Sequence, residues 1–182
     1  MKILIISTCK EKLHELEFVK PIEKILSQNN MNFTTINYQN LSQNYLNNYD
    51  KIIITGTSFK DNEFLEDLKK FSWINNLNKP ILGICAGMHL IGLTFKGKLI
   101  DLKEIGEKRI NFKKEFLGLD KKQSVYLLHG KQINFEKLNV FEIFSQRVDS
   151  IYAVKHKSKE IYGISFHPEV KNPELIKNFC KL

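Results

Sequence analysis

The sequence is poor in the residues that mark several classes of protein. It has 182 residues and only three cysteines, with no Cys-x-x-Cys pair, which argues against a disulfide-rich secreted domain and against a zinc site. The chain has one tryptophan, so few side chains of this type could stack on nucleic-acid bases. Its apolar runs are too short to cross a bilayer or to form a signal peptide. We therefore expect a cytoplasmic protein without metal or cofactor that binds neither membranes nor nucleic acid.

The charge of the chain is positive but dispersed. There are 28 lysines and arginines against 20 acidic residues, a formal net charge of +8. The basic residues are interspersed with acids, as in the run Glu107-Lys108-Arg109, so we interpret them as a solvated face that suits an acidic partner or a nucleotide-binding subunit. The length and the 42% of hydrophobic residues are typical of one globular domain spanning residues 1–182.

The apolar segments predict an α/β fold with a mainly parallel sheet flanked by helices. Residues 2–7 are apolar almost throughout, as expected for a strand covered on both faces. Further strands are predicted at residues 32–38, 51–55, 81–84, 150–155 and 161–166. Helices are predicted at residues 13–26, 63–71, 86–91 and 173–180, and short strands alternating with charged turns at residues 96–122.

The stretch PILGICAGMHL, residues 80–90, places Cys85 between a predicted strand and a predicted helix. Its Gly-x-Cys-x-Gly core is the thiol version of the nucleophile elbow, in which small residues let the strand and helix backbones approach closely. The N-terminus of the helix favours the thiolate over the thiol. Cys85 is therefore a candidate nucleophile, although the motif alone leaves open a small buried cysteine with a packing role.

A second motif near the C-terminus supplies a base and a carboxylate. The predicted strand that begins at Ile161 ends in His167-Pro168-Glu169. In an extended segment side chains two residues apart point to the same face, so Glu169 is expected to orient the imidazole of His167. Together with Cys85 these residues make a complete nucleophilic triad.

The two motifs GICAGMHL and FHPEV resemble the signature of the class I, triad-type glutamine amidotransferases. The resemblance implies a flavodoxin-like fold with a small antiparallel section. It also implies a stand-alone glutaminase subunit in which the cysteine forms a glutamyl thioester from L-glutamine. Because no synthetase sequence accompanies these motifs, the ammonia is expected to pass to a separate synthetase subunit.

The same resemblance assigns an oxyanion site. In the family a Ser-Gly-Gly-Pro turn and the N–H after the nucleophile hold the oxyanion, and here these positions are Thr55-Gly56-Thr57-Ser58 and Ala86. Thr57 replaces the second glycine. If that position needs a positive φ, Thr57 would be strained by about 1 to 2 kcal/mol.

Two further departures from the family pattern lie in the expected glutamine pocket. His89 stands four residues after Cys85, where the family usually carries a glutamine that contacts the substrate. His129 and Gly130 match the family's Ser-His-Gly-Asp segment over the pocket, but Leu128 and Lys131 replace its serine and aspartate. These changes weaken the resemblance to the branch that serves guanine nucleotides.

The departures keep two other functions open. A cysteine hydrolase on the same scaffold that acts on γ-glutamyl compounds would use the same triad and tolerate His89. A non-catalytic regulatory subunit with a decayed glutamine pocket would explain Thr57 and His89, but not the intact triad. Cys9 follows the first predicted strand. It either lines the active site at this edge of the sheet or is a loop cysteine with no role in the reaction.

Overall fold

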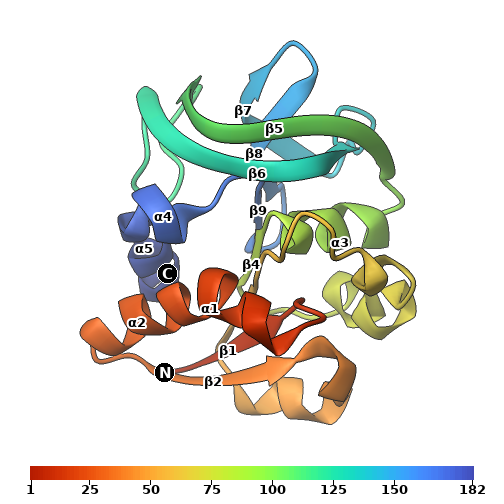
Figure 1. Ribbon diagram of the computed structural model, residues 1–182, viewed down its shortest axis with the longest axis vertical. Helices are drawn as coiled ribbons and strands as arrows, with labels where there is room; N and C mark the ends of the chain where they lie inside the picture. The colour runs from red at the N-terminus through yellow and green to blue at the C-terminus, as the bar shows by residue number, and fades with distance from the viewer.

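The computed structural model describes residues 1–182, and a seven-stranded sheet runs through its middle (Figure 1). The strand order is β2-β1-β3-β4-β9-β8-β7, with parallel pairing from β2 to β9 and antiparallel pairing from β9 to β7. The bounds are β1 (Lys2–Ser7), β2 (Asn32–Asn37), β3 (Lys51–Ile54), β4 (Ile81–Ile84), β7 (Phe141–Arg147), β8 (Ser150–His156) and β9 (Ile161–Ile164). The mainly parallel α/β fold predicted from the sequence is confirmed.

Helices cover both faces of this sheet, which explains why its strands are apolar throughout. In β1, Ile3 and Ile5 pack on one side while Leu4 and Ile6 pack on the other. The first side carries α1 (Glu15–Phe18), α2 (Lys20–Gln28), α4 (Pro168–Lys171) and α5 (Pro173–Lys181), with η1 (Lys12–His14) before α1. The second side carries α3 (Ala86–Thr94) and the 3₁₀ segments η2 (Tyr38–Asn40), η3 (Gln43–Asn48), η4 (Glu63–Leu65) and η5 (Leu68–Asn75).

The prediction of one surface helix over residues 63–71 is wrong, because that region consists of the 3₁₀ segments η4 and η5. Phe71 and Ile74 are buried, and Leu68 packs against the same hydrophobic cluster. A spacing of three residues places such side chains on one side of a 3₁₀ helix, which has three residues per turn. Burial of this stripe therefore favours the tighter helix.

Residues 98–134 form a separate antiparallel pair, the β5–β6 ribbon, which arches across the top of the molecule (Figure 1). The prediction of several short strands is wrong here, because β5 (Lys98–Asn111) is a single strand of 14 residues paired with β6 (Lys122–Asn134). The charged residues that were interpreted as turns lie largely on the exposed side of the ribbon. Its bend comes from an irregular register between Asp101 and Glu104 and from Gly106, which has a φ of +98°.

No helix of this fold combines the length and the hydropathy that crossing a membrane requires.

A buried lysine joins the end of α5 to the central sheet. Lys51, the first residue of β3, is 4% exposed, and burial lowers its pKa. Its Nζ donates to the carbonyl oxygens of Phe179, Cys180 and Leu182 at 3.3, 2.7 and 2.6 Å. The last carbonyl groups of a helix receive no N–H donor from a following turn. Lys51 supplies that donor and caps the C-terminal end of α5.

We expect Lys51→Met to lower the free energy of unfolding by about 2 kcal/mol, because it removes charged hydrogen bonds and leaves the helix end without donors. Lys24→Met, at an exposed position of α2, is the matched control and should leave stability within about 0.5 kcal/mol. Urea unfolding followed by circular dichroism measures both. Equal unfolding midpoints for the two variants would contradict this role of Lys51.

Candidate active site

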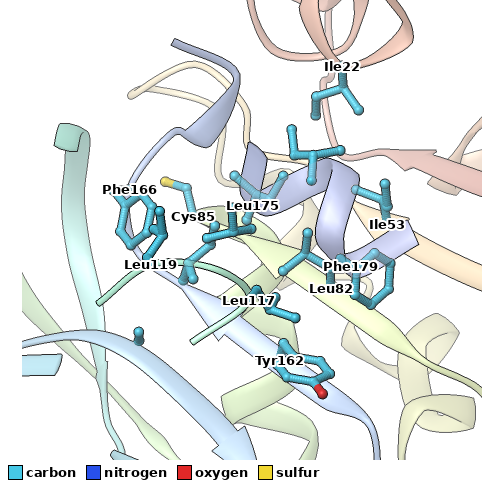
Figure 2. Close-up of a cluster of buried hydrophobic side chains, with 14 of the residues drawn as sticks. Ile22, Ile53, Leu82, Cys85, Leu117, Leu119, Tyr162, Phe166, Leu175 and Phe179 are labelled. Atoms are coloured by element: carbon cyan, nitrogen blue, oxygen red, sulfur yellow. The ribbon is translucent and has the colours of Figure 1, made fainter. Parts of the chain in front are cut away.

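Cys85 occupies a strained turn between β4 and α3. Its backbone has a φ of 49° and a ψ of −101°, a region that residues with a side chain rarely adopt and that costs on the order of 1 to 3 kcal/mol. The N–H of Cys85 donates to the carbonyl oxygen of Ile164 at 2.7 Å, which ties the turn to β9. Figure 2 shows Cys85 at the edge of a hydrophobic cluster near Phe166, with its sulfur directed away from Leu82 and Phe179.

Two glycines let the turn pack this tightly. A Cβ added to Gly83 would lie 2.6 Å from the carbonyl carbon and oxygen of Gly87. A Cβ added to Gly87 would lie 2.3 Å from the carbonyl oxygen of Ile54 in β3. The helix that follows Cys85 therefore contacts the backbones of two strands directly, as the elbow motif predicts.

His167 and Glu169 form a buried ion pair. Nδ1 of His167 lies 2.8 Å from Oε1 of Glu169, and both side chains are almost fully buried. The extended geometry predicted for this pair from the sequence is wrong, because Glu169 is not in an extended segment. His167 is extended and precedes α4, whereas Glu169 lies in the first turn of that helix after Pro168. Proline suits this first-turn position, and the turn brings the carboxylate back to the imidazole.

The other ring nitrogen of His167, Nε2, has no hydrogen-bond partner within the chain. Cys85 is the other ionisable group that acts on this imidazole besides Glu169. Burial alone would lower the pKa of His167, but the charge of Glu169 and the neighbouring Cys85 outweigh it and raise the pKa well above its ordinary value. A Cβ added to Gly56 would lie 2.7 Å from Cε1 of His167 and 3.4 Å from Cβ of Cys85, so both side chains flank this glycine. The three predicted triad residues are therefore adjacent and in the order that nucleophilic catalysis requires.

We expect Glu169→Gln to lower turnover by roughly 10²- to 10⁴-fold and to move the alkaline limb of the pH–rate profile to lower pH. The negative charge of Glu169 favours the protonated imidazole, so without it His167 loses its proton at lower pH. The pH profile of the reaction at Cys85 measures both effects. Glu174→Gln, the same change in the first turn of α5, is the control. An unchanged alkaline limb in Glu169→Gln would contradict the assignment.

The two expected oxyanion donors are free. The N–H groups of Ala86 and Thr57 donate to no carbonyl in the structure; Ala86 is the first residue of α3, where helices have unpaired donors. Thr57 is not among the residues with a positive φ, so the strain considered for this position is absent.

Asp61 holds this turn, and sequence reasoning missed it. Its Oδ2 accepts hydrogen bonds from Oγ1 of Thr57 at 2.8 Å and from the N–H of Lys10 at 3.2 Å, and it lies 2.8 Å from Nδ1 of His14. Although burial raises the pKa of Asp61, its hydrogen bonds to His14, Thr57 and Lys10 hold it below its ordinary value. The only signal in the sequence is a carboxylate four residues after Thr57, which belongs to no motif.

A cavity of about 270 Å³ opens beside Cys85. Six residues singled out in the sequence line it: Thr57, Cys85, Ala86, His89, His129 and Gly130. Gly56, His167 and Glu169 are not part of its wall. Ser58, Leu128 and Lys131, which depart from the family pattern, also line the cavity. The wall residues that no motif indicated are Phe59, Asp61, Asn62, Phe64 and Lys103.

His89 faces this cavity from α3 as a neutral side chain. It is 6% exposed, and its Nε2 has no hydrogen-bond partner. Burial, together with the neighbouring charge of His129, lowers the pKa of His89 to about 3, although a hydrogen bond to the backbone of Lys131 opposes the shift. One ring nitrogen therefore has no partner within the chain, and the side chain carries no charge near neutral pH.

His129 contacts Glu104, a residue that belongs to no motif of the sequence. Its Nδ1 lies 3.3 Å from the carbonyl oxygen of Ser165, and its Nε2 lies 3.5 Å from Oε2 of Glu104. Burial raises the pKa of Glu104, but its hydrogen bonds to His129 and Lys108 outweigh burial and lower the pKa to about 2. Gly130 allows Phe59 to close the wall, because a Cβ there would lie 2.8 Å from that ring.

The other two cysteines lie outside this cavity. Cys9 is completely buried, its Sγ lies 3.9 Å from the carbonyl oxygen of Gly56, and burial raises its pKa. Cys180 lies in the core under α5, and burial raises its pKa to about 12. Cys85 is the one cysteine in the cavity wall.

Comparison with known proteins identifies the family. The model of the class-I glutamine amidotransferases matches residues 14–181. The chain belongs to this family. As a class-I amidotransferase it resembles the glutamine-hydrolyzing GMP synthase of Staphylococcus saprophyticus, with 38% identity over 117 residues, 59% of this chain and 23% of that protein. It also resembles a separate glutamine-hydrolyzing GMP synthase subunit of Methanococcus aeolicus, with 35% identity over 117 residues, 59% of this chain and 62% of that protein.

Solved structures agree on the amidotransferase fold. A GMP synthase subunit from Thermoplasma acidophilum superposes with a TM-score of 0.86 at 22% identity, covering 100% of this chain and 92% of that one. A glutamine amidotransferase from Thermotoga maritima superposes with a TM-score of 0.72 at 17% identity, covering 100% and 81%. At these identities the likeness establishes the fold alone. The chain spans about a quarter of the S. saprophyticus protein and under two thirds of the M. aeolicus protein.

Proposed function

We propose that this amidotransferase hydrolyses L-glutamine to glutamate and ammonia through a thioester on Cys85. The observation that carries the proposal is the thiol of Cys85 at a strained turn, against the unpaired Nε2 of a histidine that Glu169 holds. The thiolate attacks the carbonyl carbon of the side-chain amide, and the electron pair of the carbonyl moves to its oxygen. The carbonyl then re-forms as the C–N bond breaks, and His167 gives its proton to the departing nitrogen, which leaves as ammonia.

The second half of the reaction uses the same groups in reverse. His167 takes a proton from water as the hydroxide oxygen attacks the thioester carbon. The C–S bond breaks, glutamate leaves, and the thiolate and imidazolium are restored. The free N–H groups of Ala86 and Thr57 are the donors for the oxyanion in both halves. His89, His129 and Gly130 line the space for the rest of the glutamine.

The ammonia is passed, in this proposal, to a separate synthetase, and residues 1–182 form one glutaminase domain. The similarity to GMP synthases makes a nucleotide-forming synthetase the first partner to test. Co-purification with such a synthetase, and ammonia release that rises when it is added, are the expected results. A glutaminase rate that no candidate synthetase changes would contradict this part.

Intact-mass analysis after exposure to an electrophilic glutamine analogue tests the reaction directly. We expect a single adduct in the wild type and in Cys9→Ser, none in Cys85→Ser, and less adduct when excess glutamine competes. Cys9 and Cys180 are buried outside the cavity and provide the internal control. Neither should be labelled, because neither has a glutamine pocket beside it. Labelling that glutamine does not suppress would contradict the proposal.

A second candidate function is hydrolysis of other γ-glutamyl compounds, and the charges of the cavity favour it. Lys103 and Lys131 line the wall, while its one carboxylate, Asp61, is already held by three partners. No free carboxylate is therefore available to the α-ammonium group of glutamine. A substrate with that amine blocked and its carboxylate free would suit Lys103 better, whereas Lys131 is already paired with Asp101 at 2.7 Å.

His89→Gln separates the two substrates. If glutamine is the substrate, we expect the variant to lower KM for glutamine several-fold, because a side-chain amide both donates and accepts where neutral His89 offers one free nitrogen. Steady-state assays with glutamine and with N-acylated γ-glutamyl amides measure both. A raised KM for glutamine, with faster turnover of the acylated amides by the wild type, would favour the second function.

A further inference from the structure

Arginine is scarce in this chain, and both arginines lie in the same place. Of the 28 basic residues, only Arg109 and Arg147 are arginines. Both line a second cavity, of about 330 Å³, together with Lys122. None of its lining residues belongs to the cavity at Cys85. Three cations therefore converge on a hollow that the proposed glutamine chemistry does not use.

Pairing between distant strands brings the arginines together. Arg109 lies near the end of β5, and Arg147 ends β7. Just beyond β5, an antiparallel bridge joins Phe112 to Ser145, and Oγ of Ser145 donates to the carbonyl oxygen of Asn111 at 2.7 Å. This bridge brings the end of β5 beside the end of β7, and both arginines line the cavity between them.

The positive charge of this cavity is not compensated by its own wall. No carboxylate lines the cavity, and none of the ion pairs of the structure uses either guanidinium. Glu107 feels the charge of Arg109 but is bound by Lys171 at 2.7 Å. The hydroxyl of Tyr152 donates to the buried Glu104 at 3.2 Å, so this tyrosine presents its ring to the cavity.

Asp149, two residues after Arg147, lines a different cavity. The remaining polar groups of the wall are the amides of Asn111 and Gln146. These can donate to, and accept from, hydroxyl groups of a ligand. The cavity thus combines a cationic end with uncharged hydrogen-bonding groups.

We propose that this cavity binds a small phosphate ester. Guanidinium groups hold phosphate oxygens in a bidentate fork, which lysine cannot do, and this explains why a chain otherwise built with lysine has arginine at these two positions. Three cations without a carboxylate match a phosphate dianion better than a monocarboxylate. The volume is that of a site for a small ligand, and the amides of Asn111 and Gln146 in its wall can bind the hydroxyl groups of such an ester.

Titration calorimetry at constant ionic strength tests the site, with inorganic phosphate and ribose 5-phosphate as probes. We expect the wild type to bind both, ribose 5-phosphate at least threefold more tightly. The double variant Arg109→Gln with Arg147→Gln should weaken both at least tenfold. Arg109→Lys with Arg147→Lys, which keeps the charge and loses the fork, should also weaken both.

The matched control is Lys69→Gln with Lys137→Gln, which removes the same charge from exposed positions without ion pairs. It should bind both probes like the wild type. An equal loss in this control, or no binding to the wild type, would overturn the site. Equal affinity for the two probes would assign the cavity to free phosphate and overturn the ester. All of these outcomes are independent of the reaction at Cys85.

Discussion

Cys85→Ala is expected to lower ammonia release from glutamine by at least 10³-fold and to leave the fold intact. The thiol is the only nucleophile of the cavity next to an imidazole, and without its sulfur no thioester forms. The loss in stability should be small, because the one hydrogen bond of Sγ is weak, at 3.6 Å from the carbonyl oxygen of Leu128. Alanine also adopts the positive φ of this turn no less easily than cysteine.

A coupled assay of ammonia measures the rate, and far-ultraviolet circular dichroism checks the fold. Cys180→Ala is the matched control: it removes a fully buried sulfur from the core and should cost stability while keeping the rate. Retained ammonia release in Cys85→Ala would remove Cys85 from the reaction. Loss of the circular dichroism signal in that variant would instead make its inactivity uninformative, and Cys85→Ser would then carry the test.

Gly87→Ala is expected to lower the free energy of unfolding by about 3 kcal/mol, at the upper end of overpacking effects. The added Cβ would lie 2.3 Å from the carbonyl oxygen of Ile54 and 3.0 Å from its Cβ. Ile54 ends β3, which is paired on both sides in the middle of the sheet, so its backbone cannot move aside. Relief requires α3 to shift, and that shift displaces Cys85.

Urea unfolding followed by circular dichroism measures this prediction, and ammonia release in the absence of urea should fall with it. Gly106→Ala in β5 is the control, because Gly106 has a φ of +98° and no atom within 4 Å of an added Cβ. It should cost about 1 to 2 kcal/mol, from backbone strain alone. If Gly87→Ala is no less stable than Gly106→Ala, the close approach of α3 to β3 does not limit the fold.

The elements that could be predicted from the sequence are those with a strong local pattern. The strands near Lys2, Ile81 and Ile161 are short apolar runs, and a strand buried on both faces has no other pattern to show. Charged residues led to the error in β5, because alternating charge on an exposed strand face resembles a series of turns. Only pairing with β6 distinguishes the two.

The residues of the candidate site likewise include some that a local pattern predicts and others that it does not. Cys85, His167 and Glu169 were found from two motifs, because the turn at Cys85 and the pair at His167 depend on backbone shape within a few residues. Asp61 and Glu104 were missed because their partners lie in other segments: His14 is 47 residues from Asp61, and Tyr152 is 48 residues from Glu104. No local pattern records a contact of that kind.

The sequence by itself predicted the α/β class, indicated Cys85, His167 and Glu169 as candidates, and carried the resemblance to the family, because apolar runs and short motifs are local patterns. The tertiary structure alone decided that Thr57 is unstrained, that His89 is neutral, and which walls surround the thiol. It alone brought Arg109 and Arg147 into one cavity. These properties depend on burial and on which charges become neighbours, and packing of distant segments sets both.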